Sequence, residues 1–527
     1  MKSLMKKVFA AAAAIATVFG LAATTVATAN AADNATLTVS TTDAKFASKT
    51  VNAYKMFSAT VSGDGKAVSY TFTDEWKPFF KNSVGLTGVT DENVNDKAND
   101  YVSKLKDSTL VAFATKASNW AQTKANNITA DATATVSADA SNGKYTATFT
   151  GLGYGYYVVA VPGATLANAK SQYATLVSVH STKVDADIKG DLPTVDKKVQ
   201  VDGTGKDATD AKIGDTLTFT LTSTIPDMSA YDTYTFNFKD TLSKGLTFGQ
   251  VKSVKVENVT LTENTDYTVT TPTASNNNTL TVAMKDFKTK QQANAGKKIT
   301  VTYTATLNEN AVVGGAGNVN SAKIQYSNNP STNGTGESEP SKVRVFTYGF
   351  TVDKYTGDYG ENATRLAGAE FTLAHKDGSA ISFVQVSAGS ATANAVYRVA
   401  KAGETGTTTI TTPANGKVVF EGLKNGEYTL TETKAPAGYN KLASAIGVKV
   451  NGQNNGTDTT NATVTITYNN DNGNDYNQTA SNGVIPVQNK SGAILPGTGG
   501  MGTIAFTVIG VLVIALGVAW TLKRKNA

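Results

Sequence analysis

Apolar and polar residues alternate along most of the chain with a period of two, which is typical of half-buried β-strands. Leu37 and Val39 show this alternation near the start, and Tyr145, Ala147 and Phe149 show it further along. Because successive side chains of a strand point to opposite faces of a sheet, the pattern predicts sheets with one face on a core and one face in water. We therefore expect a mainly β protein.

One part of the first 190 residues has a helical period instead. Apolar side chains recur there at steps of three or four residues, within two segments: Val102, Leu105, Ala112, Phe113 and Trp120. This spacing predicts one amphipathic helix region that lies across a sheet. Packing alone accounts for the pattern, so we assign no chemistry to it.

The two ends of the chain carry long apolar runs. Three lysines and an apolar core are followed by small residues, which is typical of a signal peptide over residues 1–31. Near the other end, an uncharged run from Thr503 to Leu522 precedes a basic cluster of Lys523, Arg524 and Lys525. About 20 apolar residues are enough to cross a bilayer, so we predict a C-terminal transmembrane helix in the precursor.

Charge and composition exclude several classes of function. The two terminal segments hold six basic and no acidic residues, so the formal charge of +6 falls to zero in the mature chain. This balance does not favour nucleic-acid binding. With no cysteine and only His180 and His375, the chain has no disulfide and little material for a metal site or a hydrolase triad. We expect no enzyme, metal or cofactor; Asp471-x-Gly473-x-Asp475 could be a calcium loop, but a plain turn is the preferred interpretation.

One motif occurs twice with the same spacing. Its copies are Phe149-x-Gly151-Leu152-x-x-Gly155-x-Tyr157 and Phe420-x-Gly422-Leu423-x-x-Gly426-x-Tyr428. Gly-Leu-x-x-Gly between alternating apolar residues predicts a tight hairpin in each copy, and related β-sandwiches as the first and last domains. The second copy is followed by Glu432, where the first has Val161, so the first domain lacks this carboxyl group.

Two sets of polar side chains fall on strand faces that are otherwise apolar. Each set holds a lysine, a carboxyl group and an asparagine: Lys197, Asp240 and Asn320, and Lys354, Glu432 and Asn489. Burial lowers the pKa of a lysine and raises that of a carboxyl group, by up to about 3–5 units. A neutral amine is a nucleophile, and a protonated carboxyl group can polarise an asparagine amide and relay a proton to departing ammonia. Fixed geometry supplies an effective molarity of roughly 10⁵ M or more, so an amide bond can form without an external enzyme.

Some alternatives remain open for these sets. In the first set, Lys198 and Asn318 are alternatives, although Lys198 points away from the face of Val195 and Val199. Lys55, in the first domain, has no visible carboxyl or asparagine partner, so we assign no bond there.

The pentapeptide Leu495-Pro496-Gly497-Thr498-Gly499 lies directly before the apolar run and the basic cluster. This order resembles the cell-wall sorting signal of Gram-positive surface proteins. The resemblance implies that a sortase cysteine attacks the carbonyl group of Thr498, releases Gly499 onward, and passes the acyl group to an amine. An ordinary membrane anchor is the simpler alternative.

Longer stretches resemble domains of fimbrial backbone proteins. The segment that opens with Leu192-Pro193-Thr194-Val195-Asp196-Lys197 resembles the isopeptide-forming D2 domain, and Thr431-Glu432-Thr433-Lys434-Ala435-Pro436 resembles the E-box of the CnaB-type pilin domain. The resemblance implies tandem Ig-like, CnaB-type β-sandwiches and self-formed Lys-Asn isopeptide bonds in the two sets. The expected order is a signal peptide (1–31), an N-terminal CnaB-like pilin domain (32–190), a D2 domain (191–340), a CnaB-type domain (341–494) and the sorting signal (495–527). Residues 329–342 form the clearest linker.

The resemblance also implies a role and partners. A class C sortase would join Thr498 to a lysine of the next copy, near the end of the first domain. The usual Tyr-Pro-Lys motif is absent there; Lys189 is our first choice because it closely precedes Pro193 and Thr194, and Lys183 is the second. A housekeeping sortase would attach the fibre to peptidoglycan, so we expect a fimbria on the cell surface that supports adhesion, with minor or tip pilins as further partners and an unknown host ligand. A monomeric sortase-anchored adhesin is the alternative, and a wall-attached enzyme is disfavoured.

Overall fold

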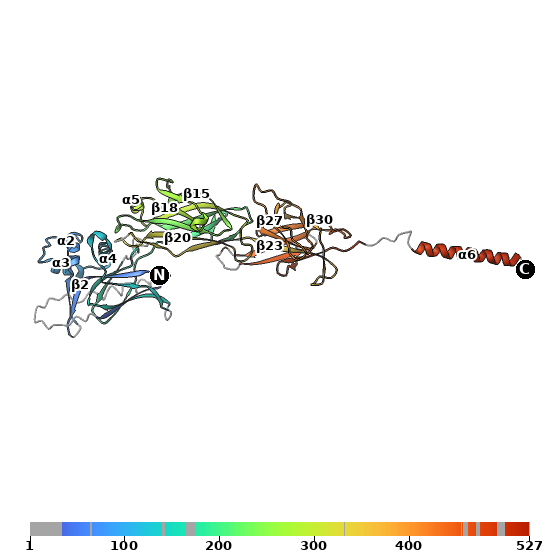
Figure 1. Cartoon of the computed structure of the whole chain (residues 1–527). Coiled ribbons are helices and arrows are strands. Elements are labelled where there is room, and N and C mark those ends of the chain that lie inside the picture. Colours follow the sequence, from blue (N-terminus) through green and yellow to red (C-terminus); the bar gives the residue numbers. More distant parts are fainter. Residues whose placement is uncertain are drawn as a thin grey trace. The chain divides into compact units, whose positions relative to one another are not determined.

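The computed structural model describes residues 34–492 and 501–525, except 64–65, 140–142, 165–173, 331–332, 455, 457–461 and 471–474, and without the side chains of 124, 501–508, 523 and 525 (Figure 1). The predicted signal peptide, the pentapeptide 495–499 and most of the Asp471 to Asp475 turn lie outside these residues. The described chain is mainly β, as predicted, and its strands form three pairs of sheets. It divides into two compact units, Met1–Tyr348 with Gly452–Val464, and Gly349–Asn451 with Thr465–Ala527.

The first pair of sheets has strand orders β5-β6-β1-β9 and β3-β2-β7-β8, with β4 beside β2. Their bounds are β1 Ala35–Thr41, β2 Thr50–Val61, β3 Val68–Phe72, β4 Ala132–Thr135, β5 Ser137–Asp139, β6 Lys144–Leu152, β7 Gly155–Ala160, β8 Thr175–Val179 and β9 Lys183–Asp187. Leu37, Val39, Ala147 and Phe149 are buried, as the alternation predicts.

The helix region of the first domain is confirmed, but it consists of three α-helices: α2 (Lys77–Asn82), α3 (Val94–Ser103) and α4 (Asp107–Gln122). These helices gather beside β2 in Figure 1, and their side chains pack with those of β2 and β7 in one core around Trp76. The helical path breaks between α3 and α4, where Asp107 has a positive φ of 45°. Because the break resets the helical phase, Phe113 is buried while Ala112 is exposed.

The prediction of a hairpin at each copy of the repeated motif is wrong. In the first copy β6 and β7 belong to different sheets, and in the second β29 (Lys417–Leu423) and β30 (Gly426–Lys434) do as well. The connection therefore crosses between sheets. In the first copy the strand after it, β7, is buried at every position and does not alternate. The copies share one detail: Tyr157 donates a hydrogen bond to the Gly153 carbonyl (2.6 Å), and Tyr428 donates one to Lys424 (2.7 Å).

The second pair of sheets has strand orders β11-β10-β13-β19-β15-β16 and β12-β22-β20-β14-β18-β17, with β21 beside β20. Their bounds are β10 Asp196–Val201, β11 Thr204–Lys206, β12 Ala208–Asp210, β13 Thr216–Thr224, β14 Phe236–Leu242, β15 Leu246–Val256, β16 Val259–Thr260, β17 Tyr267–Thr270, β18 Thr279–Met284, β19 Lys298–Leu307, β20 Asn318–Ser327, β21 Thr335–Glu337 and β22 Ser341–Phe346. A short helix, α5, spans Phe287–Gln291.

The stretch 329–342 is not simply a linker. Residues 335–337 form β21, which pairs with β20, and Ser338 is buried. The Ser338 hydroxyl group accepts a hydrogen bond from the Ile324 backbone (2.9 Å), so the polar composition of this stretch supplies partners for the sheet.

The third pair of sheets has strand orders β24-β23-β29-β27-β26, with β34 beside β23, and β28-β25-β30-β31-β32-β33. The remaining bounds are β23 Tyr348–Thr356, β24 Thr364–Arg365, β25 Glu370–His375, β26 Phe383–Ser387, β27 Ala395–Val399, β28 Ile410–Thr411, β31 Ile446–Gln453, β32 Thr463–Asn469, β33 Gln478–Thr479 and β34 Val484–Gln488.

Near the C-terminus, Met501–Lys525 forms helix α6. Over the described residues alone, no helix has both the length and the apolar character needed to cross a membrane. The transmembrane helix therefore stays a prediction.

Candidate functional site

The structure brings Lys354, Glu432 and Asn489 together in the third pair of sheets. Lys354 lies in β23, which pairs in parallel with β34, and Asn489 follows β34 directly and donates its backbone N–H to the Tyr355 carbonyl (3.0 Å). Glu432 reaches them from β30 in the facing sheet. The exposed fractions are 0% for Lys354, 2% for Glu432 and 1% for Asn489, so the three polar groups lie in the core, shielded from bulk solvent.

The Glu432 carboxyl group contacts both of the other side chains. One oxygen, Oε1, lies 2.9 Å from Lys354 Nζ, and the other, Oε2, accepts a hydrogen bond from Asn489 Nδ2 (3.0 Å). The backbone N–H of Leu442 also donates to Oε2 (2.7 Å) and fixes the carboxyl group in place. Burial lowers the pKa of Lys354, against the opposing effect of Glu432, so the neutral and nucleophilic amine is more populated than in water.

A second cluster holds Lys197, Asp240 and Asn320, all 0% exposed. Lys197 lies in β10 of one sheet, and the other two come from β14 and β20 of the facing sheet. Asp240 is opposite Ala322 and Asn320 is opposite Leu242, so the two polar groups are diagonal neighbours on the same face. Lys197 forms an ion pair with Asp240, and burial lowers the pKa of Lys197 to about 8, although Asp240 opposes the shift.

The second cluster has a fourth member that the sequence analysis did not single out. Tyr303 of β19 is 0% exposed, and its hydroxyl group donates to Asp240 Oδ2 (2.6 Å). The Tyr303 hydroxyl oxygen in turn accepts hydrogen bonds from Lys197 Nζ (2.9 Å) and Asn320 Nδ2 (2.6 Å). Tyr303 alternates with apolar residues in β19, so the strand pattern alone marks it as an ordinary core aromatic side chain.

The alternative residues for this set lie elsewhere. Lys198 Nζ is 2.5 Å from Asp207 and 3.3 Å from Asp196, in surface ion pairs. Asn318 is buried, but its side chain bonds to the backbone of Val312 and to the Val345 carbonyl (3.1 Å), which accounts for its burial.

The lysines of the first domain are more exposed. Lys55 is only half-buried, and its Nζ lies 5.7 Å from the centre of the Tyr157 ring. Lys183 is exposed at the start of β9, an edge strand among the described strands of its sheet. Lys189 keeps 32% of its side chain exposed and lies 3.3 Å from Asp187. Both Lys183 and Lys189 can therefore meet a second protein.

The two buried clusters hold the groups needed for amide exchange. Each has an amine with a lowered pKa and an asparagine amide nitrogen that is hydrogen-bonded within the cluster. Among the described residues, no group donates a hydrogen bond to Oδ1 of Asn320 or of Asn489, so both amide carbonyl groups are buried without a partner. No cluster of metal-ligating side chains occurs in the described part of the chain.

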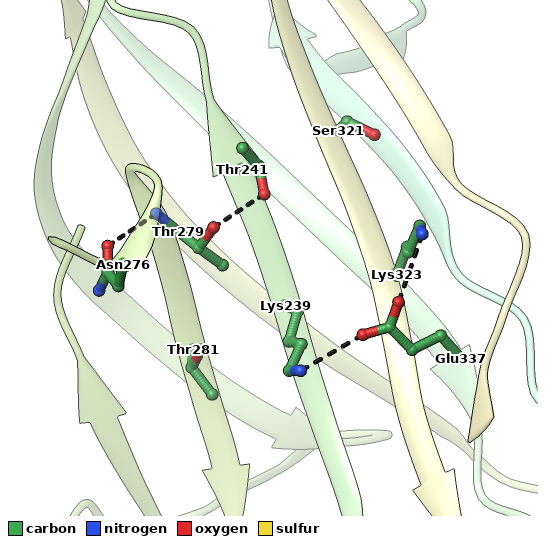
Figure 2. A pocket seen from close by; sticks show the side chains of 8 residues that line it. All are labelled: Lys239, Thr241, Asn276, Thr279, Thr281, Ser321, Lys323 and Glu337. Carbon is green, nitrogen blue, oxygen red and sulfur yellow. Dashed lines mark hydrogen bonds and ion pairs between the residues drawn. The ribbon is translucent and has the colours of Figure 1, made fainter. Parts of the chain in front are cut away.

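A polar hollow of about 380 Å³ lies on strands β14, β18, β20 and β21 and the turn before β18, and no residue of either cluster lines it (Figure 2). Figure 2 shows Glu337 between two lysines, with its oxygens 3.3 Å from Lys239 and 3.3 Å from Lys323. A hydrogen bond of 2.9 Å joins the neighbouring hydroxyl groups of Thr241 and Thr279. The charged side chains that line this hollow form ion pairs with one another, so we assign the hollow no role.

Comparison with known proteins identifies the domain types. Residues 213–330 match the model of the Gram-positive pilin backbone subunit 2, Cna-B-like domain, and residues 356–465 match that of the SpaA prealbumin-like fold domain. The trypsin-resistant surface T6 protein of Streptococcus pyogenes serotype M6 is 26% identical over 278 residues. That match spans 48% of this chain and 44% of the relative, which is less than half of its length.

Two solved pilin structures are similar over larger parts of the chain. The T6 backbone pilin of serotype M6 Streptococcus pyogenes is 18% identical, with a TM-score of 0.47 over 87% of this chain and 99% of that one. The major pilin SpaD from Corynebacterium diphtheriae is 21% identical, with a TM-score of 0.40 over 77% of this chain and 88% of that one. Two segments of the chain thus match domain models of Gram-positive pilins, and the chain is similar to the T6 protein over 278 residues.

Proposed function

We propose that this protein is the structural backbone subunit of a covalently polymerised pilus and that two internal Lys-Asn isopeptide bonds stabilise it. The observation that carries the proposal is the pair of buried clusters, because each places an amine, a carboxyl group and an asparagine amide in one solvent-inaccessible core. Asp240 and Asn320 lie within the matched segment 213–330, and Glu432 lies within the matched segment 356–465; the other members of the two clusters lie outside these segments.

The proposed reaction is an amide exchange. In the third domain, a bond forms between Lys354 Nζ and Asn489 Cγ, and the bond between Cγ and Nδ2 breaks. The amine loses a proton to Glu432, and the departing Nδ2 gains one and leaves as ammonia. Glu432 contacts both nitrogens, so a single carboxyl group can pass this proton. In the second domain the corresponding bond forms between Lys197 Nζ and Asn320 Cγ with release of ammonia, and Asp240 is the carboxyl group that accepts the amine proton.

The proposed polymerisation step joins the C-terminal sorting signal of one subunit to a lysine near the end of the first domain of the next. A class C sortase cleaves after Thr498 and joins its carbonyl group to Lys189 of the next copy, with Lys183 as the second choice. The exposure of both lysines supports this assignment. A housekeeping sortase then transfers the last subunit to peptidoglycan, and minor or tip pilins are further partners.

The proposed domain order follows the sequence: signal peptide 1–31, pilin domain 32–190, D2 domain 191–340, CnaB-type domain 341–494 and sorting signal 495–527. In the precursor α6 crosses the plasma membrane. The exposure of its described apolar side chains, such as Leu516 (69%) and Trp520 (64%), supports this placement.

An immunoblot of cell-wall extracts tests the polymer. We expect a ladder of bands that survives boiling in detergent, whereas a single band would mean the monomeric adhesin. Intact mass tests the internal bonds independently. We expect a deficit of two ammonia molecules relative to the sequence, and a mass without any deficit would exclude both bonds.

A further inference from the structure

The two buried clusters differ in how the carboxyl group reaches the asparagine. In the third domain Glu432 bonds directly to Asn489 Nδ2 (3.0 Å). In the second domain the corresponding acid is Asp240, which is shorter by one methylene group. No hydrogen bond joins Asp240 to Asn320 in the described structure, and the Tyr303 hydroxyl group lies between them.

The Tyr303 hydroxyl group forms every hydrogen bond that a phenol can form. A phenol has one hydrogen to donate and two lone pairs that accept. Its hydrogen goes to Asp240, and its lone pairs accept from Lys197 and Asn320. The oxygen therefore touches the nucleophilic nitrogen, the acid and the leaving nitrogen at once. Such an arrangement exceeds what packing requires, because a buried tyrosine needs only one partner.

We propose that Tyr303 is a catalytic residue of the second domain, which carries the proton from Asp240 to the Nδ2 leaving group of Asn320. This inference rests on the proposed isopeptide bond. As Lys197 Nζ attacks Asn320 Cγ, the amine gives its proton to the Asp240 carboxylate. Tyr303 then donates its own proton to Nδ2 and takes one from Asp240, so that ammonia leaves and the phenol and the carboxylate are both restored.

The surroundings of Tyr303 fit this role. Its ring is stacked on Phe219, with centroids 5.3 Å apart and an angle of 18° between the planes, which holds the hydroxyl group in one place. Burial, together with the charge of Asp240, raises the pKa of Tyr303 well above its usual value. The phenol thus stays protonated at rest, and it transfers a proton by giving one as it receives another.

The test is Tyr303→Phe in the full-length chain purified in detergent, with peptide mapping to detect the linked Lys197 and Asn320 peptides over time. General acid–base catalysis is typically worth 10²–10⁴-fold, so we expect the link to form at least about 100-fold more slowly. The Lys354 to Asn489 link should form normally in the same molecule. Tyr326→Phe, at a second buried tyrosine of this domain, is the matched control and should leave both links unchanged.

A rescue variant separates proton transfer from packing. Asp240→Glu adds the missing methylene group, so in the Tyr303→Phe background it should let the carboxyl group reach Asn320 directly and restore the link. A link that forms at the normal rate in Tyr303→Phe would overturn the proposal, and so would a folded, unlinked variant that Asp240→Glu does not restore. If the unmodified chain lacks both links, the proposed isopeptide bonds themselves are wrong.

Discussion

Replacing Asn489 with alanine removes the carbonyl group that Lys354 is proposed to attack, and it leaves the unlinked amine of Lys354 paired with Glu432. The variant therefore isolates the cross-link from the buried charge. Breaking the ion pair instead would leave an uncompensated charge in the core, which usually costs 3–5 kcal/mol by itself.

The expected loss of stability follows from the length of chain that the bond closes. By analogy with disulfides, a cross-link over roughly 100 residues stabilises a domain by about 4–5 kcal/mol. For a domain of about 150 residues, each 1 kcal/mol shifts the melting temperature by roughly 2–4 °C. We therefore expect Asn489→Ala to lower the transition of the third domain by roughly 8–20 °C, and the mass deficit to fall from two ammonia molecules to one.

Calorimetry and intact mass measure these two effects. The matched control is Asn469→Ala, at another buried asparagine of the same domain, whose Oδ1 accepts a hydrogen bond from the Gly447 backbone (3.0 Å). It should cost only about 1–3 kcal/mol, the usual cost of leaving a buried donor unpaired, and keep the full mass deficit. Two results would show that the cross-link is not where we place it: a deficit of two ammonia molecules in Asn489→Ala, or a melting temperature equal to that of Asn469→Ala.

Three further predictions concern the other sites. Lys189→Ala should abolish the high-molecular-weight ladder on immunoblots while Lys183→Ala preserves it, and the reverse result would transfer the acceptor role to Lys183. Thr498→Ala should abolish both the ladder and wall attachment, so that the protein stays in the membrane fraction. In Asn320→Ala, Lys197 remains a free amine whose folded pKa, about 8, lies below its ordinary value of 10.5. The unfolded chain then binds more protons between these values, so stability should rise by roughly 3 kcal/mol from pH 8 to pH 10.5, and adding Lys197→Met should remove most of this rise in chemical denaturation.

Strand alternation was enough to find the lysine, carboxyl and asparagine residues of the two buried clusters. Lys197, Asp240 and Lys354 each share a period of two with apolar neighbours, and each is fully buried. The rule works here because a sandwich strand has one inward face, so a polar residue in the apolar phase is carried into the core. Alternation does not show which strand faces meet in the core. The assignment of each lysine to its carboxyl group and asparagine therefore depended on the family resemblance as well.

Other features lie beyond what the pattern can show. In the sequence Tyr303 has the pattern of an ordinary aromatic core residue. Only the three-dimensional structure shows that its hydroxyl group has three hydrogen-bond partners. The repeated Gly-Leu-x-x-Gly motif has the composition of a hairpin, yet it connects different sheets. Short-range sequence signals describe how sharply the chain turns, whereas the choice between pairing and crossing depends on distant strands.

The two proposed bonds would resist force in different ways. Lys354 and Asn489 come from β23 and the end of β34, which are parallel neighbours in one sheet, so their bond would prevent the last strand from being pulled off the first. Lys197 and Asn320 come from opposite sheets, so their bond would prevent the two layers from sliding or separating. Because β23 and β34 run parallel, a pull between the start of β23 and the end of β34 acts along the strands and loads all of their hydrogen bonds together. The bond from Lys354 to Asn489 would carry this load in place of the hydrogen bonds, so its removal should lower the force at which the third domain unfolds in single-molecule pulling.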